Sequence, residues 1–452
     1  MSTDISSATA SELPAHDGKA AGEESLAPQQ VRIMGRFSYL LAWFGGCVAI
    51  GTFTMGSSVV GTLNLIQATL AIAIGCFVIG VALVLNGAAG YKYGIPFVVQ
   101  ARSAFGFTGT RLPGLVRAVP AIVWYGFQSW IGAGALNMVS ATLFGFDNLV
   151  FFFIAFQFLQ IGLSVMGFQG IKWLGDVGSA FILASLVYMF YSTVQRYGDE
   201  LSMSLLTMQG SWGLPFWSAT MLFLGIYSTM ILNVSDYSRE HEHGSGPGLL
   251  TTLYSMSILP CTLFMGLIGY MVSEATGVAD PIEVFANAVD NTPLLMCTLL
   301  FIAFAQVTTN VLNNVVPPTY VLMDVFKLKF RPATVIVGLL AFATFPWKLV
   351  SADSAAGLQV FVQTYSAFLG PIFAILVVDY YLIRKRTLNL QHLYDAEGPY
   401  RGVNYAALVA TAIGVVAALS LSSISWYASL IPAGLSYYLL MQYWPACARF
   451  RQ

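Results

Sequence analysis

Two apolar stretches carry polar side chains at spacings that suit the binding of a flat, uncharged molecule. In the run Val119–Gly132, Trp124 and Gln128 are four residues apart, which places them on one face of a helix. The indole can stack on a planar ring, and the amide can both donate to and accept from groups at the ring edge. The structural alternative is that Trp124 packs against a neighbouring helix and Gln128 bonds across it.

The second stretch, Ala305–Asn314, contains the adjacent hydroxyls of Thr308 and Thr309. Uncharged oxygens of this kind suit a sodium ion when backbone carbonyls complete the shell. The same hydroxyls could instead satisfy carbonyls of their own helix. Asn314 follows Thr308 by about one and a half helical turns, so it could present an amide to a substrate beside the ion. Such proximity is what coupling requires.

Glycines mark possible interruptions in two of the helices. Gly45, Gly46 and Gly51 lie in the first expected span, and Gly225 lies near Tyr227 in the sixth. Broken helices at matching places in two halves of a chain indicate a mid-membrane site built on inverted repeats. Glycine also permits close helix packing. The matching placement, in the first span of each five-helix half, favours transport.

The composition identifies the environment of these helices. Of the 452 residues, 57% are hydrophobic and 9% are charged, whereas a soluble domain has about 25% charged residues. Such an apolar chain is stable where its surface faces lipid. The net charge of -1, with no polybasic tract, gives no sign of a nucleic-acid partner. The sequence therefore predicts a membrane protein.

Apolar runs long enough to cross about 30 Å of hydrocarbon predict twelve transmembrane helices. They lie at roughly 37–61, 66–88, 113–142, 148–168, 175–195, 213–235, 249–273, 293–324, 332–350, 357–383, 403–423 and 425–445. Of the 20 Lys and Arg residues, all but Arg196 and Lys348 fall in segments on one side of the bilayer. Cytoplasmic loops carry such an excess, so both termini are predicted to be cytoplasmic, in an inner (plasma) membrane.

Several classes of site are absent from the spans. None has a convincing Asp, Glu, Lys or Arg near its middle, which argues against a proton relay and for a neutral substrate. All four histidines fall in tails or loops, and His241 and His243 are expected to be solvated. The five cysteines lack CxxC spacing and are expected to be free thiols. No cluster suits an enzyme, so we expect no catalytic residues.

Asp236 and Asp379 lie near predicted cytoplasmic helix ends and leave proton coupling open. Their alternative role is to cap a helix terminus or to pair with Arg239 and Arg384.

A series of short motifs covers nearly all of the chain after residue 36. They are Val84–Phe97, Ala101–Gly106, Leu112–Arg117, Trp124–Gln128, Asn233–Arg239, Thr308–Asn314, Pro346–Lys348 and Val377–Tyr381. Together and in this order they resemble the nucleobase:cation symporter family, within the purine-cytosine permease superfamily, and especially its allantoin and hydantoin permeases.

The resemblance implies an all-α, leucine-transporter-like fold with two inverted five-helix repeats, two extra C-terminal helices and alternating access. We expect a disordered cytoplasmic tail at 1–35, a transporter domain at 36–446 and a cytoplasmic C-terminus at 447–452. Within that domain, the repeats would cover about 36–196 and 212–384, and the extra helices about 403–445.

The resemblance also implies residue roles. Trp124 would stack on the substrate, Gln128 and Asn314 would bond to its edge, and an aromatic residue of the sixth span would cover its other face. The hydantoin permeases place a tryptophan after paired glycines there, whereas this chain has Gly225-Ile226-Tyr227, so the role passes to Tyr227.

The implied sodium site would combine hydroxyls and carbonyls from two spans. The hydroxyls are those of Thr308 and Thr309, and the carbonyls are those of Ala305 and, in the first span, Gly45 and Val48.

We therefore expect a secondary active importer of a planar nitrogen heterocycle (a nucleobase, allantoin or a hydantoin) coupled to Na+, acting as a monomer without a cofactor. The alternatives are a proton-coupled cytosine, purine, uracil or vitamin permease and an amino-acid carrier of the same fold. An amino acid would need groups for a zwitterion, whereas Trp124, Gln128 and Asn314 are neutral.

Overall fold

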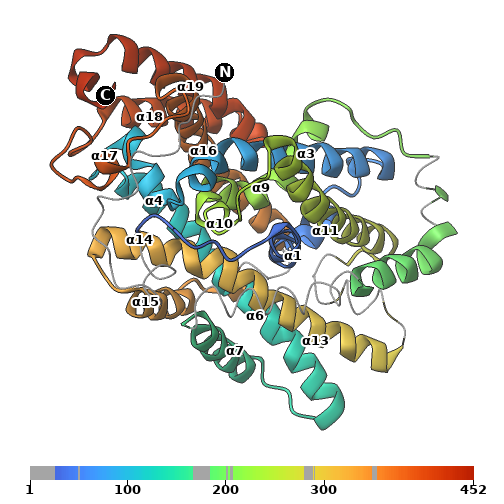
Figure 1. The fold of residues 1–452 in the computed structure, drawn as a ribbon. Coiled ribbons are helices and arrows are strands. Elements are labelled where there is room, and N and C mark those ends of the chain that lie inside the picture. The colour runs from blue at the N-terminus through green and yellow to red at the C-terminus, as the bar shows by residue number, and fades with distance from the viewer. Residues whose placement is uncertain are drawn as a thin grey trace.

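Helices form the regular structure of the described chain (Figure 1). The computed structural model describes residues 26–48, 51–165, 184–199, 207–278, 291–348 and 354–451, together with Ser202, Met203, Glu283 and Val289. Within these residues, β-type pairing is limited to an isolated bridge between Met34 and His241. The all-α prediction is therefore confirmed.

Five helices of the described chain are long and apolar enough to cross a membrane. They are α3 (Leu65–Tyr93), α9 (Leu214–Leu232), α11 (Pro247–Thr276), the continuous helix Thr292–Phe326 and the helix Gly357–Ile383. The fourth comprises α13 (Thr292–Thr309), the π-helix η1 (Asn310–Val315) and α14 (Val316–Phe326), and the fifth comprises most of α16 (Ser354–Val378) and the π-helix η3 (Asp379–Ile383). Each of them coincides with a predicted span.

The other predicted spans also meet helices. Two pairs are bent, α1 (Arg36–Gly46) with α2 (Gly51–Ser58) by 59°, and α18 (Tyr405–Ser420) with the helix Ser422–Tyr443, which contains α19 (Ser425–Tyr443), by 114°. The predicted spans 113–142, 148–168 and 332–350 meet α6 (Arg111–Phe144), α7 (Leu149–Ser164) and α15 (Phe330–Phe342), respectively. The predicted span 175–195 lies partly outside the described residues, of which 184–199 are helical.

The first span is interrupted where its glycines predict, between Gly46 and Gly51. The sixth is not. Helix α9 continues through Gly225 to Leu232, and α10 (Ser235–Ser238) begins after Asn233 and Val234. Gly225 instead lets α16 approach, because a Cβ there would lie 2.5 Å from Val362 Cγ1. The predicted interruption at Gly225 is therefore wrong, and the break lies two helical turns further along the chain.

Glycines bring α2 and α11 into backbone contact. A Cβ on Gly56 would overlap the carbonyl of Gly266, and a Cβ on Gly269 would overlap the carbonyl of Phe53. Small residues at such crossings let helices pack closely where the solvent supplies no hydrophobic force. The short second half of the broken span is thus fixed against a long, continuous helix.

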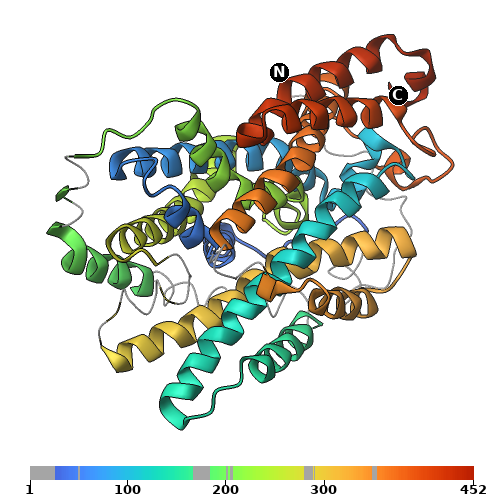
Figure 2. The same cartoon turned by 180° about the vertical axis from the view of Figure 1, so that it is seen from behind.

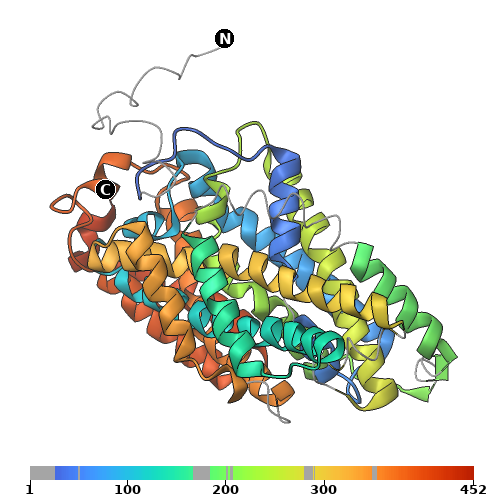
Figure 3. The same cartoon turned by 90° about the horizontal axis from the view of Figure 1, so that it is seen from below.

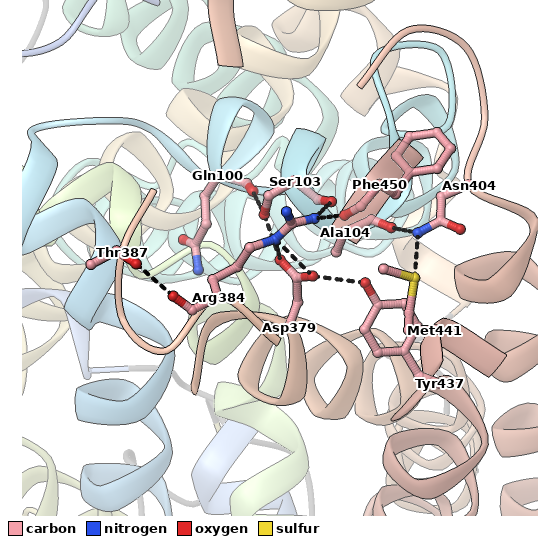
Figure 4. A network of polar contacts seen from close by, with 10 residues as sticks. All are labelled: Gln100, Ser103, Ala104, Asp379, Arg384, Thr387, Asn404, Tyr437, Met441 and Phe450. Carbon is pink, nitrogen blue, oxygen red and sulfur yellow. Dashed lines mark hydrogen bonds and ion pairs between the residues drawn. The ribbon is translucent and has the colours of Figure 1, made fainter. Parts of the chain in front are cut away.

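Helices α18 and α19 pack together at one edge of the molecule, on the far side from α7 (Figures 1 and 2). Buried polar contacts join this edge to the rest (Figure 4). The carboxylate of Asp379 accepts hydrogen bonds from Ser103 Oγ (2.7 Å) and from Tyr437 Oη of α19 (2.8 Å), and it pairs with Arg384 (3.4 Å). Arg384 also donates to the carbonyl of Phe450. The predicted pairing of Asp379 with Arg384 is confirmed.

One end of the molecule carries residues 26–35, α4 (Phe97–Gln100) and the C-terminal helix η5 (Pro445–Arg451) (Figure 3). The predicted tail at 1–35 lies partly outside the described residues. Gln29 and Met34 are buried, and the backbone N–H of Gln29 donates to the carbonyl of Gly94 (2.8 Å). The packed chain therefore begins before residue 36.

His241 departs from its prediction as a solvated residue, whereas His243 is exposed as expected. The His241 ring is fully buried, stacks on Tyr39 (4.5 Å between centroids) and bonds to the Met34 carbonyl (3.0 Å) and Ser245 Oγ (3.0 Å). The packed N-terminal segment covers this loop, and that contact is not visible in the sequence.

Candidate substrate and ion site

Helix α6 presents Trp124 and Gln128, and both side chains are buried. The indole N–H donates to Tyr365 Oη of α16 (3.3 Å), and that hydroxyl donates to the carbonyl of Gly225 on α9 (2.9 Å). On α2, Gly51 leaves room for the indole, because a Cβ there would lie 2.7 Å from Trp124 Cη2. The indole is therefore oriented by α16 and α2 directly, and by α9 through Tyr365.

The amide of Gln128 has an unused acceptor. Within the described residues, its Oε1 has no hydrogen-bond partner, although the side chain is 3% exposed. A buried carbonyl without a partner costs about 1–3 kcal/mol. The predicted structural alternative is that Gln128 bonds across to the helix against which Trp124 packs, but its Oε1 makes no such bond in the part of the chain that the structure describes. A ligand that stacks on the Trp124 indole could donate a hydrogen bond to this acceptor, which lies one helical turn away.

Asn314 lies in the π-helix η1, and its Nδ2 donates to Oδ1 of Asn310 (2.8 Å). Asn310 Nδ2 in turn lies 3.3 Å from the carbonyl oxygen of Tyr125 and 3.3 Å from Ser129 Oγ. Tyr125 and Ser129 are the residues that directly follow Trp124 and Gln128 on α6. The network thus ties Asn314 to the same stretch of α6, and π-turns of this kind often occur at functional sites.

Tyr227 is directed elsewhere by its hydroxyl group. Its Oη donates to the carbonyl of Cys47 (3.0 Å), in the break of the first span, and bonds to Thr262 Oγ1 of α11 (2.8 Å). The described contacts therefore join Tyr227 to the break rather than to Trp124 or Gln128. Its role over a substrate stays a prediction.

The five residues of the predicted ion site come together in two adjoining groups. Thr309 Oγ1 lies 3.1 Å from the carbonyl oxygen of Gly45 and 3.3 Å from that of Val48. Thr308 Oγ1 lies 2.9 Å from the carbonyl oxygen of Ala305, one turn back on its own helix. Thr308 thus bonds to a carbonyl of its own helix, which is the structural alternative, whereas Thr309 contacts the first span. Ion binding by either hydroxyl stays a prediction.

The chemistry of this oxygen set fits a hard monovalent cation. All five oxygens are uncharged, and hard cations prefer oxygen ligands. The Thr309 hydroxyl has one proton to share between two carbonyls, so it cannot satisfy both of them at once. Within the described residues, no group of His, Cys, Asp and Glu could hold a metal ion.

Next to these oxygens, a buried arginine joins both helix breaks. Arg117 of α6 donates to Asn233 Oδ1 (2.7 Å), at the α9–α10 break, and to the carbonyl of Asn313 (2.8 Å). Asn313 donates to the carbonyl of Gly46 at the α1–α2 break (2.7 Å). Arg117 is one of the basic residues that the sequence predicts on the cytoplasmic side, but its side chain is fully buried.

Asp236 follows the same break. It accepts from the backbone amide of Phe97 (2.8 Å), at the start of α4, and from Asn233 Nδ2 (2.9 Å). Of its two predicted roles, the capping of a helix end is therefore confirmed, although the helix belongs to another segment. Arg239 forms an ion pair with Glu240 (3.3 Å).

Several residues of the site were not predicted, namely Ser129, Gln160, Asn310, Asn313, Tyr365 and Arg117. Asn310 and Asn313 belong to the polar stretch Ala305–Asn314, so its composition was a signal. Tyr365 and Gln160 lie in apolar runs, where a single polar residue gives little indication of its partner.

The broken helices, the buried neutral groups between them and the spanning helices define a multi-pass membrane transporter. Within that class, the family of permeases for cytosine/purines, uracil, thiamine and allantoin has a model that matches residues 27–444. The chain belongs to this family, so the resemblance read from its motifs is confirmed.

Named relatives are similar over most of their length. The hydantoin permease of Microbacterium maritypicum is 27% identical, covering 93% of this chain and 88% of its own length. The allantoin permease of Bacillus subtilis is 28% identical, covering 93% of both chains.

Solved structures agree with the fold. Mhp1, a nucleobase-cation-symport-1 family transporter in a closed conformation with bromovinylhydantoin bound, gives a TM-score of 0.84 at 25% identity, covering 95% of this chain and 99% of that one. MhsT, in complex with L-phenylalanine, gives 0.57 at 14% identity and shares the fold alone. The predicted leucine-transporter-like fold is confirmed.

Proposed function

We propose that this permease imports a planar nitrogen heterocycle together with Na+ by alternating access. The observation that carries the proposal is the contact of Thr309 Oγ1 with the carbonyl oxygens of Gly45 and Val48. It joins a broken helix to the helix that presents Asn314. An ion bound there holds these two elements together, so it can favour one conformation of the site and thereby alter substrate affinity.

Neutral groups support a heterocycle as the substrate. An oriented indole in Trp124 offers a stacking surface, and the amides of Gln128 and Asn314 offer edge contacts. The named relatives, which include hydantoin and allantoin permeases, agree with this class. Within the proposed shell, a carboxylate or ammonium partner for a zwitterion is lacking, which disfavours an amino-acid carrier.

Proton coupling receives less support. The two carboxylates considered for it already have partners, because Asp379 pairs with Arg384 and Asp236 caps the start of α4. A relay group must exchange its proton during each cycle, whereas these carboxylates are held by several bonds.

We further propose that the protein functions as a monomer in an inner (plasma) membrane, with both termini in the cytoplasm. The distribution of Lys and Arg supports this orientation. The end that carries residues 26–35 and η5 would then face the cytoplasm.

Uptake into proteoliposomes tests the proposal. Labelled hydantoin, allantoin, uracil, cytosine and adenine are offered under an imposed sodium gradient or an imposed proton gradient. We expect one ring to accumulate with sodium, and accumulation to be lost in Gln128→Ala and in Thr309→Ala. Thr319→Ala is the matched control, since its hydroxyl bonds to the carbonyl of Val315 on its own helix. Accumulation driven by protons alone would contradict the sodium assignment.

A further inference from the structure

A network of buried amides behind the proposed substrate shell fixes which way Asn314 faces. The two ends of a side-chain amide are distinguished by their partners, because the NH2 group only donates and the oxygen only accepts. The network contains one partner whose chemistry is unambiguous, the backbone carbonyl of Tyr125, which can only accept. The orientation of each amide can therefore be worked out from this carbonyl.

Asn310 is the first amide. The group that it places 3.3 Å from the Tyr125 carbonyl must be its NH2. The same NH2 donates to Oε1 of Gln160 on α7 (2.8 Å), and Gln160 Nε2 donates to Ser129 Oγ (2.8 Å). Asn310, Gln160 and Ser129 are all fully buried. The remaining atom, Asn310 Oδ1, therefore faces Asn314 as an acceptor.

Asn314 is the second amide. It must turn its NH2 toward Asn310 Oδ1, and the two atoms lie 2.8 Å apart. Its own oxygen is thereby directed away from Asn310, and that oxygen makes no hydrogen bond with a described side chain. One N–H of its NH2 is also left over, since an amide has two donors. Asn314 therefore offers an acceptor beside one donor, and the buried Gln128 Oε1 adds a second acceptor without a partner.

We propose that Asn310 and Gln160 are positioning residues that hold Asn314 as an acceptor, and that the permease consequently selects rings with an N–H beside a carbonyl, as in cyclic ureides and imides. This inference rests on the proposed function. A ring whose nitrogen is methylated at that edge would have no N–H to donate to the Asn314 oxygen. Such a loss costs about 10- to 100-fold in affinity.

Binding to the purified, full-length protein tests the proposal. The probes are hydantoin, 1-methylhydantoin and 3-methylhydantoin, and uracil with its 1-methyl and 3-methyl forms. In the unaltered protein, we expect at least one methyl form of the bound ring to bind about 10- to 100-fold more weakly than the parent. Equal binding of the parent and both methyl forms would overturn this inference and leave the proposed function intact. Binding of none of the rings would overturn both.

Variants test the positioning role. Asn310→Leu is expected to weaken parent-ring binding and to reduce the preference for the parent over the methyl form to about threefold or less, because Asn314 can then turn. Gln160→Met should reduce the preference in the same direction. If the variants lower the affinity for parent and methyl forms equally, the role is merely structural and the proposal fails.

Gln157→Met is the matched control. Gln157 lies on the same helix, is equally buried and accepts from the same Ser129 hydroxyl (3.2 Å), but no described contact joins it to Asn310. The preference of this variant for the parent ring over the methyl form is expected to stay within about twofold of that of the unaltered protein. A loss of preference in Gln157→Met as large as that in Gln160→Met would contradict a specific role for the Asn310 contact.

Discussion

At the scale of single residues, the position of one indole depends on a missing side chain. Trp124 occupies the space that a Cβ of Gly51 would need, and its N–H is held by Tyr365. Because Gly51 begins the second half of the broken span, the stacking surface and the break are built together. A change at Gly51 should therefore act on ligand binding through Trp124.

Gly51→Ala is the first prediction. The added Cβ would lie 2.7 Å from Trp124 Cη2, so either the indole or α2 must shift. Overpacking of this kind costs about 1–3 kcal/mol, and we expect about a tenfold or greater loss of ring affinity. The measurement is a ligand titration in which tryptophan fluorescence reports binding.

Gly162→Ala is the control for this change, because a Cβ there meets no atom within 4 Å. It should leave the affinity unchanged. Normal ring binding by Gly51→Ala would mean that the indole is not confined as we describe.

At the scale of helices, the sequence predicted the first break but misplaced the second. Gly46 and Gly51 flank the first break, so glycine was a reliable signal there. The second lies at Asn233, whose side chain accepts from Arg117 and donates to Asp236. A helix end set by contacts between distant segments leaves no local pattern, because neither Asn nor Val is a strong helix breaker.

The residues of the candidate site also divide into those that the sequence predicts and those that it does not. Paired hydroxyls and an indole beside an amide are local patterns, so Thr308, Thr309, Trp124 and Gln128 were predicted from the sequence. The contact of Asn310 with Gln160 joins residues 150 positions apart, and it depends on how α7 packs against η1. Such a contact follows from the fold and not from spacing.

Gly56→Ala is the prediction at this scale. Its Cβ would overlap the backbone carbonyl of Gly266, which cannot move aside as a flexible side chain could. Helices α2 and α11 must separate, at a cost of about 1–3 kcal/mol. We expect a lower yield of folded protein and a lower midpoint of thermal unfolding in detergent. Gly248→Ala, in the open first turn of α11, should behave like the unaltered protein. Equal stability of the two variants would show that the crossing is looser than described.

At the scale of the whole molecule, the C-terminal helices are fastened to the transporter core through a buried carboxylate. Asp379 directly follows α16 in the long helix Gly357–Ile383, and it accepts hydrogen bonds from Ser103 of α5 (Arg102–Phe105) and Tyr437 of α19 (Figure 4). A buried carboxylate is stable only when it is paired and hydrogen-bonded. This cluster thus joins segments more than 300 residues apart in the chain.

Tyr437→Phe measures how strongly that cluster holds α19. The change removes the hydroxyl that donates to Asp379 Oδ1 at 2.8 Å and preserves the ring. Hydrogen bonds to charged groups contribute about 1.5–3 kcal/mol, so we expect the midpoint of thermal unfolding to fall by several degrees. Tyr438→Phe, at the neighbouring and partly exposed residue, should leave it unchanged. Because the proposed substrate and ion residues do not contact Tyr437, ring affinity at low temperature should be preserved in both variants. A loss of affinity in Tyr437→Phe alone would mean that the C-terminal helices also govern the conformation of the site.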